Sequence, residues 1–224
     1  GYMTKKIDIE GNVQTVIESL YNNKESFLRN SAKYLKLIKK IKSNIKTNKE
    51  NIQFHYDIGN DFYKLWLDDT MTYSCGYFEN ETDSLKQAQE NKENHILKKL
   101  NLKEGQSLLD IGCGWGELII LAAKQYKVKA VGITLSKEQL QKANDRIKAE
   151  GLEDLVEVRL SDYRELKNIS FDRIVSVGML EHVGKENLSE YFQVVNNLLK
   201  DKGISLLHCI TGGNEGGNNT WIDK

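Results

Sequence analysis

After residue 105, short apolar runs alternate along the sequence with amphipathic segments of helical period. The apolar runs span residues 107–111, 128–133, 156–160, 173–177 and 204–210. Helical patterns span residues 117–125, residues 136–149, where Ser136 is a suitable N-cap, and a segment from Leu188 that Gly203 ends. Strands that alternate with helices at this spacing are typical of parallel sheets. The sequence therefore predicts an α/β fold with a doubly wound, mainly parallel sheet.

The predicted sheet ends on an open edge. Edge strands are normally paired or covered, yet the chain finishes at Lys224, shortly after a stretch rich in glycine and asparagine at 212–219. We interpret this as a truncation in which the C-terminal strands of the domain are missing. An open fifth strand also offers a surface on which two copies pair, so a homodimer is among the expected assemblies.

The net charge of zero conceals an asymmetry between the first 50 residues and the rest of the 224-residue chain. Residues 1–50 carry eleven Lys or Arg and five Asp or Glu, about +6, which leaves about −6 for the remainder. In this basic segment Tyr34, Ile38, Ile41 and Ile45 recur at helical spacing among lysines. The pattern predicts a basic amphipathic helix.

Three interpretations of this basic helix are open. It packs on the main domain with its lysines in water, or it lies on an anionic membrane surface, where each lysine contributes about 1 kcal/mol. Binding to nucleic acid is the least favoured of the three, and we expect no nucleic-acid partner.

The cysteines and the hydropathy of the chain bear on its location. Cys75, Cys113 and Cys209 are scattered and odd in number, which fits a reducing compartment better than a disulfide framework, and no cluster with metal-ligand spacing predicts a metal site. No apolar run approaches the roughly 20 residues of a membrane-spanning helix, and no signal peptide is expected. We predict a cytoplasmic protein that associates peripherally with the membrane.

A glycine-rich loop follows the first predicted strand, in the order Asp110, Gly112, Gly114, Gly116. Glycines let the backbone approach a ligand closely, and the following helix offers free N–H groups. The G-x-G-x-G spacing differs from the G-x-G-x-x-G of dinucleotide sites, and the second strand ends in Gly-Ile-Thr without the expected acid. A nicotinamide cofactor is therefore disfavoured.

The run Asp-x-Gly-x-Gly-x-Gly after a first strand resembles instead the signature of S-adenosylmethionine-dependent methyltransferases. Asp162, at the end of the third predicted strand, fits this interpretation because its carboxylate can accept from an adenine amino group.

Several further motifs make a closer resemblance. They are FHYDIGNDFY at 54–63, MTYSCGYF at 71–78, LDIGCGWG at 109–116, GITLS at 132–136, DRIVSVGM at 172–179, EHVG at 181–184 and LH at 207–208. In this order, over residues 52–224, they resemble the cyclopropane-fatty-acyl-phospholipid synthases and their mycolic acid relatives.

The resemblance implies roles for individual residues. Tyr73 and Ser74 match contacts to the methionine end of S-adenosylmethionine, and Asp110, Gly112, Gly114 and Gly116 match its binding loop. Thr134 and Gln139 match contacts around the ribose, and Asp162 with Tyr163 matches the adenine end. Cys75, Glu181, His208 and the backbone of Ile210 match the cradle for a bicarbonate ion.

The same resemblance implies a reaction: a methylene is transferred to the cis double bond of unsaturated acyl chains of membrane phospholipids, and bicarbonate deprotonates the carbocation. Two alternatives stay open. One is a related methyltransferase that acts on an amine or adds a branch methyl to a lipid, and the other is an inactive, truncated cofactor-binding fragment. The charge asymmetry sets apart a basic helical segment at 1–50. The rest divides into a helical entry region at 51–104, which completes the active site, and a Rossmann-like cofactor domain at 105–224 whose C-terminal strands are missing.

Overall fold

The computed structural model of the protein describes residues 11–22 and 59–211. The predicted basic helix around residues 34–46 and the first part of the FHYDIGNDFY motif lie outside the described residues. The chain divides into two compact units, residues 1–42 and 43–224. In the first unit the structure describes one helix, α1 (Val13–Asn22). The second unit holds the sheet and the candidate site.

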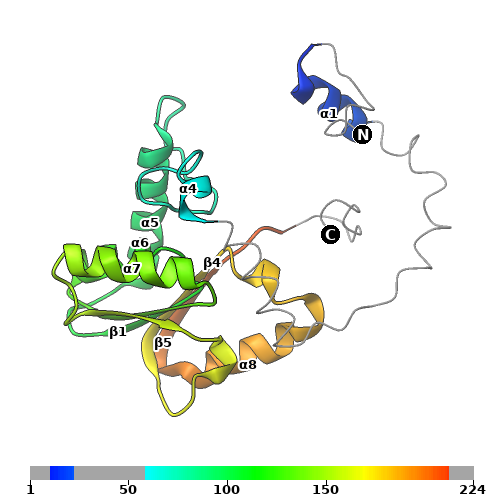
Figure 1. Cartoon of the computed structure of the whole chain (residues 1–224). Coiled ribbons are helices and arrows are strands. Elements are labelled where there is room, and N and C mark those ends of the chain that lie inside the picture. Colours follow the sequence, from blue (N-terminus) through cyan, green and yellow to red (C-terminus); the bar gives the residue numbers. More distant parts are fainter. Residues whose placement is uncertain (1–10, 23–58, 212–224) are drawn as a thin grey trace. The chain divides into compact units, whose positions relative to one another are not determined.

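The sheet of the second unit is parallel throughout its described strands. These are β1 (Ser107–Ile111), β2 (Lys129–Thr134), β3 (Val156–Leu160), β4 (Phe171–Val177) and β5 (Leu199–His208). They lie in the order β3-β2-β1-β4-β5 (Figure 1). The predicted α/β fold with a doubly wound parallel sheet is confirmed.

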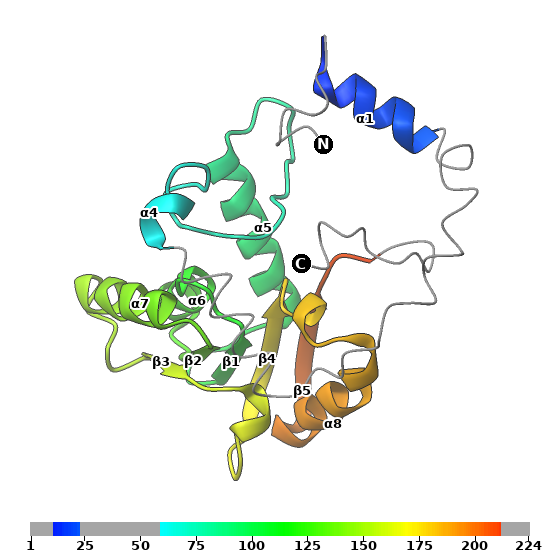
Figure 2. The same ribbon diagram turned by 45° about the vertical axis from the view of Figure 1, so that its right-hand side comes forward.

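Helices cover both faces of the sheet. On one face α5 (Leu85–Leu100), α6 (Glu117–Tyr126) and α7 (Lys137–Ala149) enclose a core that includes Leu108 and Val175. On the other face α8 (Leu188–Leu198) packs over Leu109 and Ile174 (Figure 2). Because successive side chains of a strand point to opposite faces, Leu108 of β1 packs in one core and Leu109 in the other.

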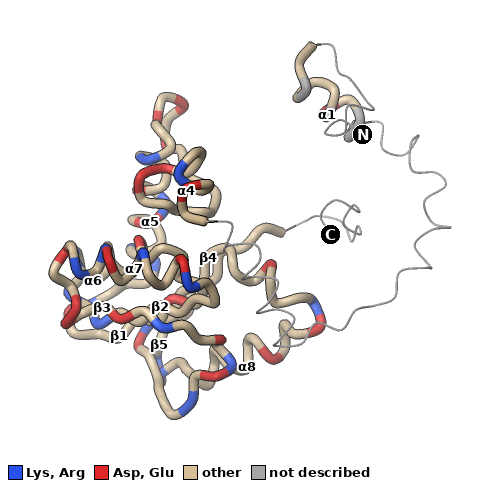
Figure 3. The backbone as a smooth tube through the Cα atoms, viewed as in Figure 1, with Lys and Arg blue, Asp and Glu red and all other residues tan. Residues whose placement is uncertain are grey.

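Local signals in the sequence fix where the helices begin. Ser136 caps α7, since its side chain accepts from the backbone N–H of Gln139, as predicted. Ser84 caps α5 in the same way. Basic and acidic residues occur along the whole of α7, whose sequence is KEQLQKANDRIKA (Figure 3). The helix is amphipathic because Ala143 and Ile147, four residues apart, are buried on one side of it in the core.

The boundary between α8 and β5 differs from the prediction. The helix ends at Leu198 rather than near Gly203, and β5 begins at Leu199 rather than at 204. Phe171 pairs with Leu199 but Arg173 pairs with Ile204, so residues 200–203 form an irregularity within the strand. The prediction was wrong because a polar turn inside a strand resembles the end of a helix.

The strand order places the candidate site. It reverses between β1 and β4, and ligands of such sheets bind beyond the carboxyl ends of the strands at this point. Short elements surround that edge, namely α4 (Asn60–Tyr63) and the 3-10 helices η4 (Tyr163–Glu165), η5 (Leu180–His182) and η6 (Lys185–Asn187). Among the described residues, no helix has the length and apolar character needed to cross a membrane.

Candidate active site

A cavity of about 150 Å³ lies at the carboxyl edge of the sheet. Its lining comes from six stretches of the chain, within residues 70–74, 92–96, 110–118, 133–139, 161–164 and 177–183. Nine of the ten residues that the resemblance assigns to the cofactor line this cavity, and the tenth, Gly116, follows the lining residue Trp115. The structure thus gathers the predicted cofactor-binding residues around one hollow.

The glycine loop adopts a backbone that only glycine takes easily. Gly112, Gly114 and Gly116 have φ angles of 86°, 54° and 86°. A Cβ on Gly112 would lie 2.9 Å from Cγ of Met179, so a side chain would also collide there. The backbone N–H groups of Gly112 and Cys113 both donate to the carbonyl of Ile133, at 3.0 Å. The loop is therefore held against β2 with its backbone exposed to the cavity.

Asp110 is a buried acid at the end of β1. Only 3% of its surface is exposed, and its Oδ1 atom has no hydrogen-bond partner among the described residues. Burial raises the pKa of Asp110 to about 7. An unpartnered buried oxygen at the cavity wall fits a ligand that brings a hydrogen-bond donor.

The residues assigned to the ribose and adenine lie farther along the cavity. Thr134 and Gln139 are buried and joined by a hydrogen bond of 2.6 Å from the threonine hydroxyl to the amide oxygen. Both carboxylate oxygens of Asp162 already accept from the Arg164 guanidinium at 2.8 Å. Burial raises the pKa of Tyr163 to about 12, so its hydroxyl is protonated. The adenine role of Asp162 requires it to share its carboxylate with Arg164.

Ser74 meets a buried lysine that the sequence analysis did not single out. Lys92 Nζ donates to Ser74 Oγ and to Gln89 Oε1, each at 2.6 Å. Gln89 Nε2 in turn donates to the Ser74 carbonyl at 2.8 Å. Burial lowers the pKa of Lys92, against the opposing effect of Glu93. Helix α5 thus fixes the segment that carries Tyr73 and Ser74.

A second cluster adjoins the cavity and contains the four residues assigned to the bicarbonate cradle. Cys75 Sγ lies 3.6 Å from His208 Nε2, and the Ile210 backbone N–H donates to Glu181 Oε1 at 2.7 Å. The Nδ1 atom of His208 is buried without a partner among the described residues. The structure therefore brings together residues that are up to 135 positions apart in the sequence.

Four aromatic side chains form a group beside the cavity. The ring centroids of Tyr63 and Trp115 are 5.1 Å apart, and those of Trp66 and Tyr73 are 5.0 Å apart. The Trp115 indole N–H donates to Asn60 Oδ1 at 2.6 Å. We call Tyr63, Trp66, Tyr73 and Trp115 the aromatic group. It joins the glycine loop to the segment that begins at α4.

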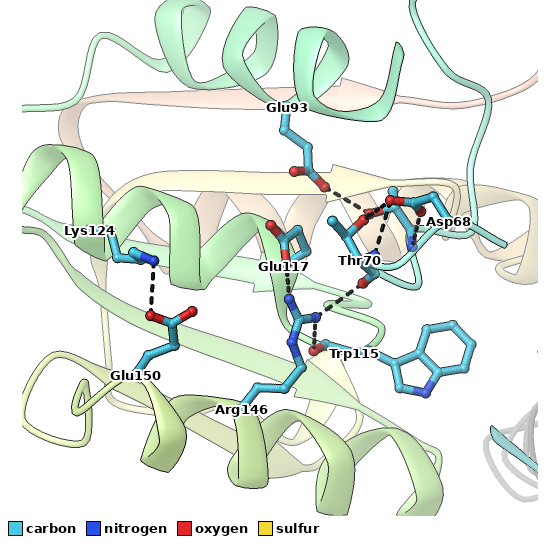
Figure 4. Close-up of polar contacts among 9 residues, drawn as sticks. Asp68, Thr70, Glu93, Trp115, Glu117, Lys124, Arg146 and Glu150 are labelled. Atoms are coloured by element: carbon cyan, nitrogen blue, oxygen red, sulfur yellow. Dashed lines mark hydrogen bonds and ion pairs between the residues drawn. The ribbon is translucent and has the colours of Figure 1, made fainter. Parts of the chain in front are cut away.

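Arg146 of α7 ties three parts of the site together (Figure 4). Its Nη1 donates to the carbonyls of Thr70 and Trp115, each at 3.1 Å, and its Nη2 pairs with Glu117. Sequence reasoning missed Arg146, Glu117 and the buried pair Lys92 and Glu93. A signal existed on α5, where Gln89, Lys92, Glu93 and Ile96 recur at helical spacing on one face, but one sequence does not reveal that such a polar face is buried.

Comparison with known proteins places this site in a family. Residues 43–224 match the family model described as mycolic acid cyclopropane synthetase, and residues 1–32 match a domain of unknown function. The chain belongs to the mycolic acid cyclopropane synthetase family. The probable fatty acid methyltransferase of Pseudomonas putida is 49% identical over 167 residues, which cover 74% of this chain and 42% of that protein.

Two other members extend the comparison of this family. The cyclopropane-fatty-acyl-phospholipid synthase of Escherichia coli K12 is 49% identical over 171 residues, 76% of this chain and 43% of that protein. The solved structure of the cyclopropane synthase MmaA2 from Mycobacterium tuberculosis superposes with a TM-score of 0.73 at 38% identity, over 78% of this chain and 64% of that one. The chain spans less than half the length of the two curated relatives.

Likeness at lower identity extends to the fold alone. Coclaurine N-methyltransferase is 22% identical with a TM-score of 0.63, over 87% of this chain and 62% of that one. The arrangement of the doubly wound sheet is thus shared with this methyltransferase.

Proposed function

We propose that the protein transfers a methylene from S-adenosylmethionine to the cis double bond of unsaturated acyl chains in phospholipids, forming a cyclopropane ring. The observation that carries this proposal is the contact of Cys75 with His208, beside that of Glu181 with Ile210, next to the glycine-loop cavity. The name of the Escherichia coli relative supports a phospholipid substrate. A cofactor cavity alone would fit any methyltransferase.

The cavity fits S-adenosylmethionine, which supplies an electrophilic methyl group on a positively charged sulfur. The bare loop at Gly112 leaves backbone groups free to approach the ligand, and a side chain there would meet Met179. Asp110 offers an unpartnered oxygen, and Tyr163 with Ile133 offers apolar surface for a flat base. Polar and apolar walls thus lie where an amino acid end and an adenine end need them.

The Cys75–His208 and Glu181–Ile210 cluster serves a separate purpose. When the double bond attacks the methyl carbon, the bond from carbon to sulfur breaks and a carbocation remains on the acyl chain. Loss of a proton from the new carbon closes the ring, and a bicarbonate ion supplies the base for it. The imidazole of His208 is a donor that can hold such an anion, since its Nδ1 has no partner among the described residues. The Ile210 N–H donates to Glu181 in this structure and can hold the anion only after it leaves that carboxylate. Glu181 lies beside it only if a proton is shared between them.

Lipid analysis tests this function. The chain is expressed in a bacterium that makes unsaturated phospholipids and lacks cyclopropane chains, and the fatty acids are analysed by mass spectrometry. We expect unsaturated chains that gain the mass of one methylene, and a product that depends on bicarbonate. His208→Ala should reduce the product about 100-fold, in line with loss of a positioned acid–base site, while the neighbouring Cys209→Ser serves as the matched control.

Two outcomes would contradict the proposal. Cofactor binding without any lipid product would leave a cofactor-binding protein with no turnover. A methylated amine or a branched chain, formed at the same rate without bicarbonate, would assign the protein to a related methyltransferase. In either case the Cys75–His208 contact would have no role in ring closure.

A further inference from the structure

A chain of hydrogen bonds leads from the cavity to an acid outside it. Glu93 Oε1 on α5 lies 3.0 Å from the Thr72 hydroxyl, which lies 2.7 Å from the Thr70 hydroxyl. The Thr70 hydroxyl lies 2.6 Å from Asp68 Oδ2. In Figure 4 the Glu93 side chain extends from α5 toward the loop that carries Asp68 and Thr70. Two carboxyl groups are thus joined through two hydroxyls.

The number of protons shared along this series of hydrogen bonds decides how many of its two carboxyl groups are ionised. Each of the three hydrogen bonds, Glu93 to Thr72, Thr72 to Thr70 and Thr70 to Asp68, needs one proton, but the two hydroxyls supply only one proton each. Two threonines therefore satisfy two links, and the third requires a protonated carboxyl at one end. With both acids ionised, the two hydroxyl oxygens at 2.7 Å would face each other without a proton between them.

The surroundings assign this proton to Glu93. Asp68 accepts two backbone N–H groups, from Thr70 at 3.0 Å and Thr72 at 3.2 Å, so both of its oxygens already act as acceptors. Glu93 is only 3% exposed and receives no such donors. Burial, with the nearby Glu117 and Asp68, raises the pKa of Glu93 to about 8, against the opposing effect of Lys92. The charge of Glu117 is itself paired with Arg146.

The second oxygen of Glu93 is free. Its Oε2 is buried with no hydrogen-bond partner among the described residues, and Glu93 lines the cavity beside Lys92 and Asp110. Glu93 and Lys92, whose charges act on each other, thus both line the hollow. This arrangement is complementary to an α-amino acid group, whose carboxylate and ammonium would meet Lys92 and Glu93.

We propose that Glu93 is a proton-linked binding residue for the amino acid end of the cofactor: its carboxyl is neutral in the free protein and releases its proton when a ligand ammonium binds at Oε2. The inference rests on the proposed function, because it takes the ligand of the cavity to be S-adenosylmethionine or its demethylated product. The proton passes to solvent, and the carboxylate left behind pairs with the ammonium. An adjacent cation lowers a carboxyl pKa by about 1–3 units.

Calorimetry of the full chain with S-adenosylhomocysteine tests this inference. Titrations at pH 7.5 in buffers of different ionisation enthalpy give the number of protons released. We expect more than about half a proton per ligand, given a starting pKa near 8. 5′-Methylthioadenosine, which lacks the amino acid group, should release none.

The variant Glu93→Gln supplies the decisive comparison. Its amide N–H can donate to Thr72 and so keeps the hydrogen-bonded chain and the fold. We expect proton release to vanish and the Kd for S-adenosylhomocysteine to rise about tenfold or more, the usual effect of losing a hydrogen bond to a charged group. The Kd for 5′-methylthioadenosine should stay within about twofold. Glu90→Gln, on the same helix and outside the cavity lining, is the matched control.

The outcomes separate the two proposals. If the wild-type chain binds neither nucleoside, the cofactor assignment fails, and the inference about Glu93 fails with it. If both ligands bind but no proton is released, or if Glu93→Gln releases as many protons as the wild type, only the inference about Glu93 is overturned.

Discussion

Asp110 is a buried acid whose protonation affects the stability of the fold. Its folded pKa of about 7 lies above the ordinary value of 3.8, so the folded state binds more protons than the unfolded state between about pH 4 and 7. The free energy of unfolding should therefore fall as the pH rises through this window. The unpartnered Oδ1 atom is retained at this cost beside the cavity.

Asp110→Asn should remove this pH dependence. We expect the variant to gain about 4 kcal/mol relative to the wild type between pH 4 and pH 8, because no buried charge forms. Thermal unfolding followed by circular dichroism across that range measures the effect, and the exposed Asp154→Asn is the control. Parallel curves for wild type and variant would show that Asp110 does not titrate in this window. Ligand affinity should fall in the same variant.

At the level of residues, the sequence predicted backbone features better than side-chain networks. The glycine loop was predictable because Gly112, Gly114 and Gly116 follow a strand at fixed spacing, and the structure gives all three positive φ angles. Lys92 and Glu93 were not predictable, because polar residues at helical spacing ordinarily face water. Their burial depends on the segment around Thr72 folding over α5, which is a tertiary event.

Among the elements, one carboxylate connects the beginnings of three strands. Asp172 at the start of β4 accepts from the backbone N–H and hydroxyl of Ser107 on β1, at 2.8 and 2.7 Å, and from Lys200 of β5 at 2.9 Å. These donors, the Ser107 N–H foremost, hold the pKa of Asp172 well below its usual value. The ionised carboxylate therefore helps to set the register of the strands.

Asp172→Ala should destabilise the protein by about 2 kcal/mol at pH 7, because strand β1 loses the acceptor for its first N–H. A lowered folded pKa contributes stability above the unfolded value of about 4 and loses it as the pH falls. The difference between variant and wild type should thus shrink in urea unfolding experiments below pH 4. Asp201→Ala, an exposed acid in the irregular part of β5, is the control. A difference that does not change with pH would contradict the role given to the charge.

The helices and strands could largely be predicted from the periodicity of hydrophobic residues in the sequence. Strands and helices from β1 to α8 appear in the predicted order because apolar runs and helical patterns alternate clearly there. The start of β5 was missed since Leu198 and Leu199 are adjacent, one closing a helix and the other pairing with Phe171. Two neighbouring apolar residues do not show where the period changes.

For the molecule as a whole, the sequence also predicts peripheral association with a membrane surface, through residues that lie outside the described part of the structure. The lysines of residues 1–50 make that segment basic, whereas the remainder is acidic. We propose that this segment brings the protein to anionic lipid surfaces, where the proposed phospholipid substrate resides. Attraction of this kind weakens with salt and with loss of anionic lipid.

Sedimentation with vesicles tests the membrane proposal. The full chain should bind vesicles containing phosphatidylserine at least about tenfold more tightly than neutral vesicles, and 0.5 M salt should abolish the difference, since roughly six excess charges each contribute about 1 kcal/mol at low salt. Residues 51–224 alone should lose this preference. Equal binding to both kinds of vesicle, or binding that ignores salt, would favour a basic helix that only packs on the protein.

The aromatic group gives the protein an optical property of its own. The protein has three tryptophans, and two of them, Trp66 and Trp115, belong to this group. Trp115 also forms part of the cavity wall. Indole emission responds to nearby charge and polarity. We therefore expect intrinsic fluorescence to change when a charged nucleoside enters the cavity, so that its occupancy can be followed in unlabelled protein.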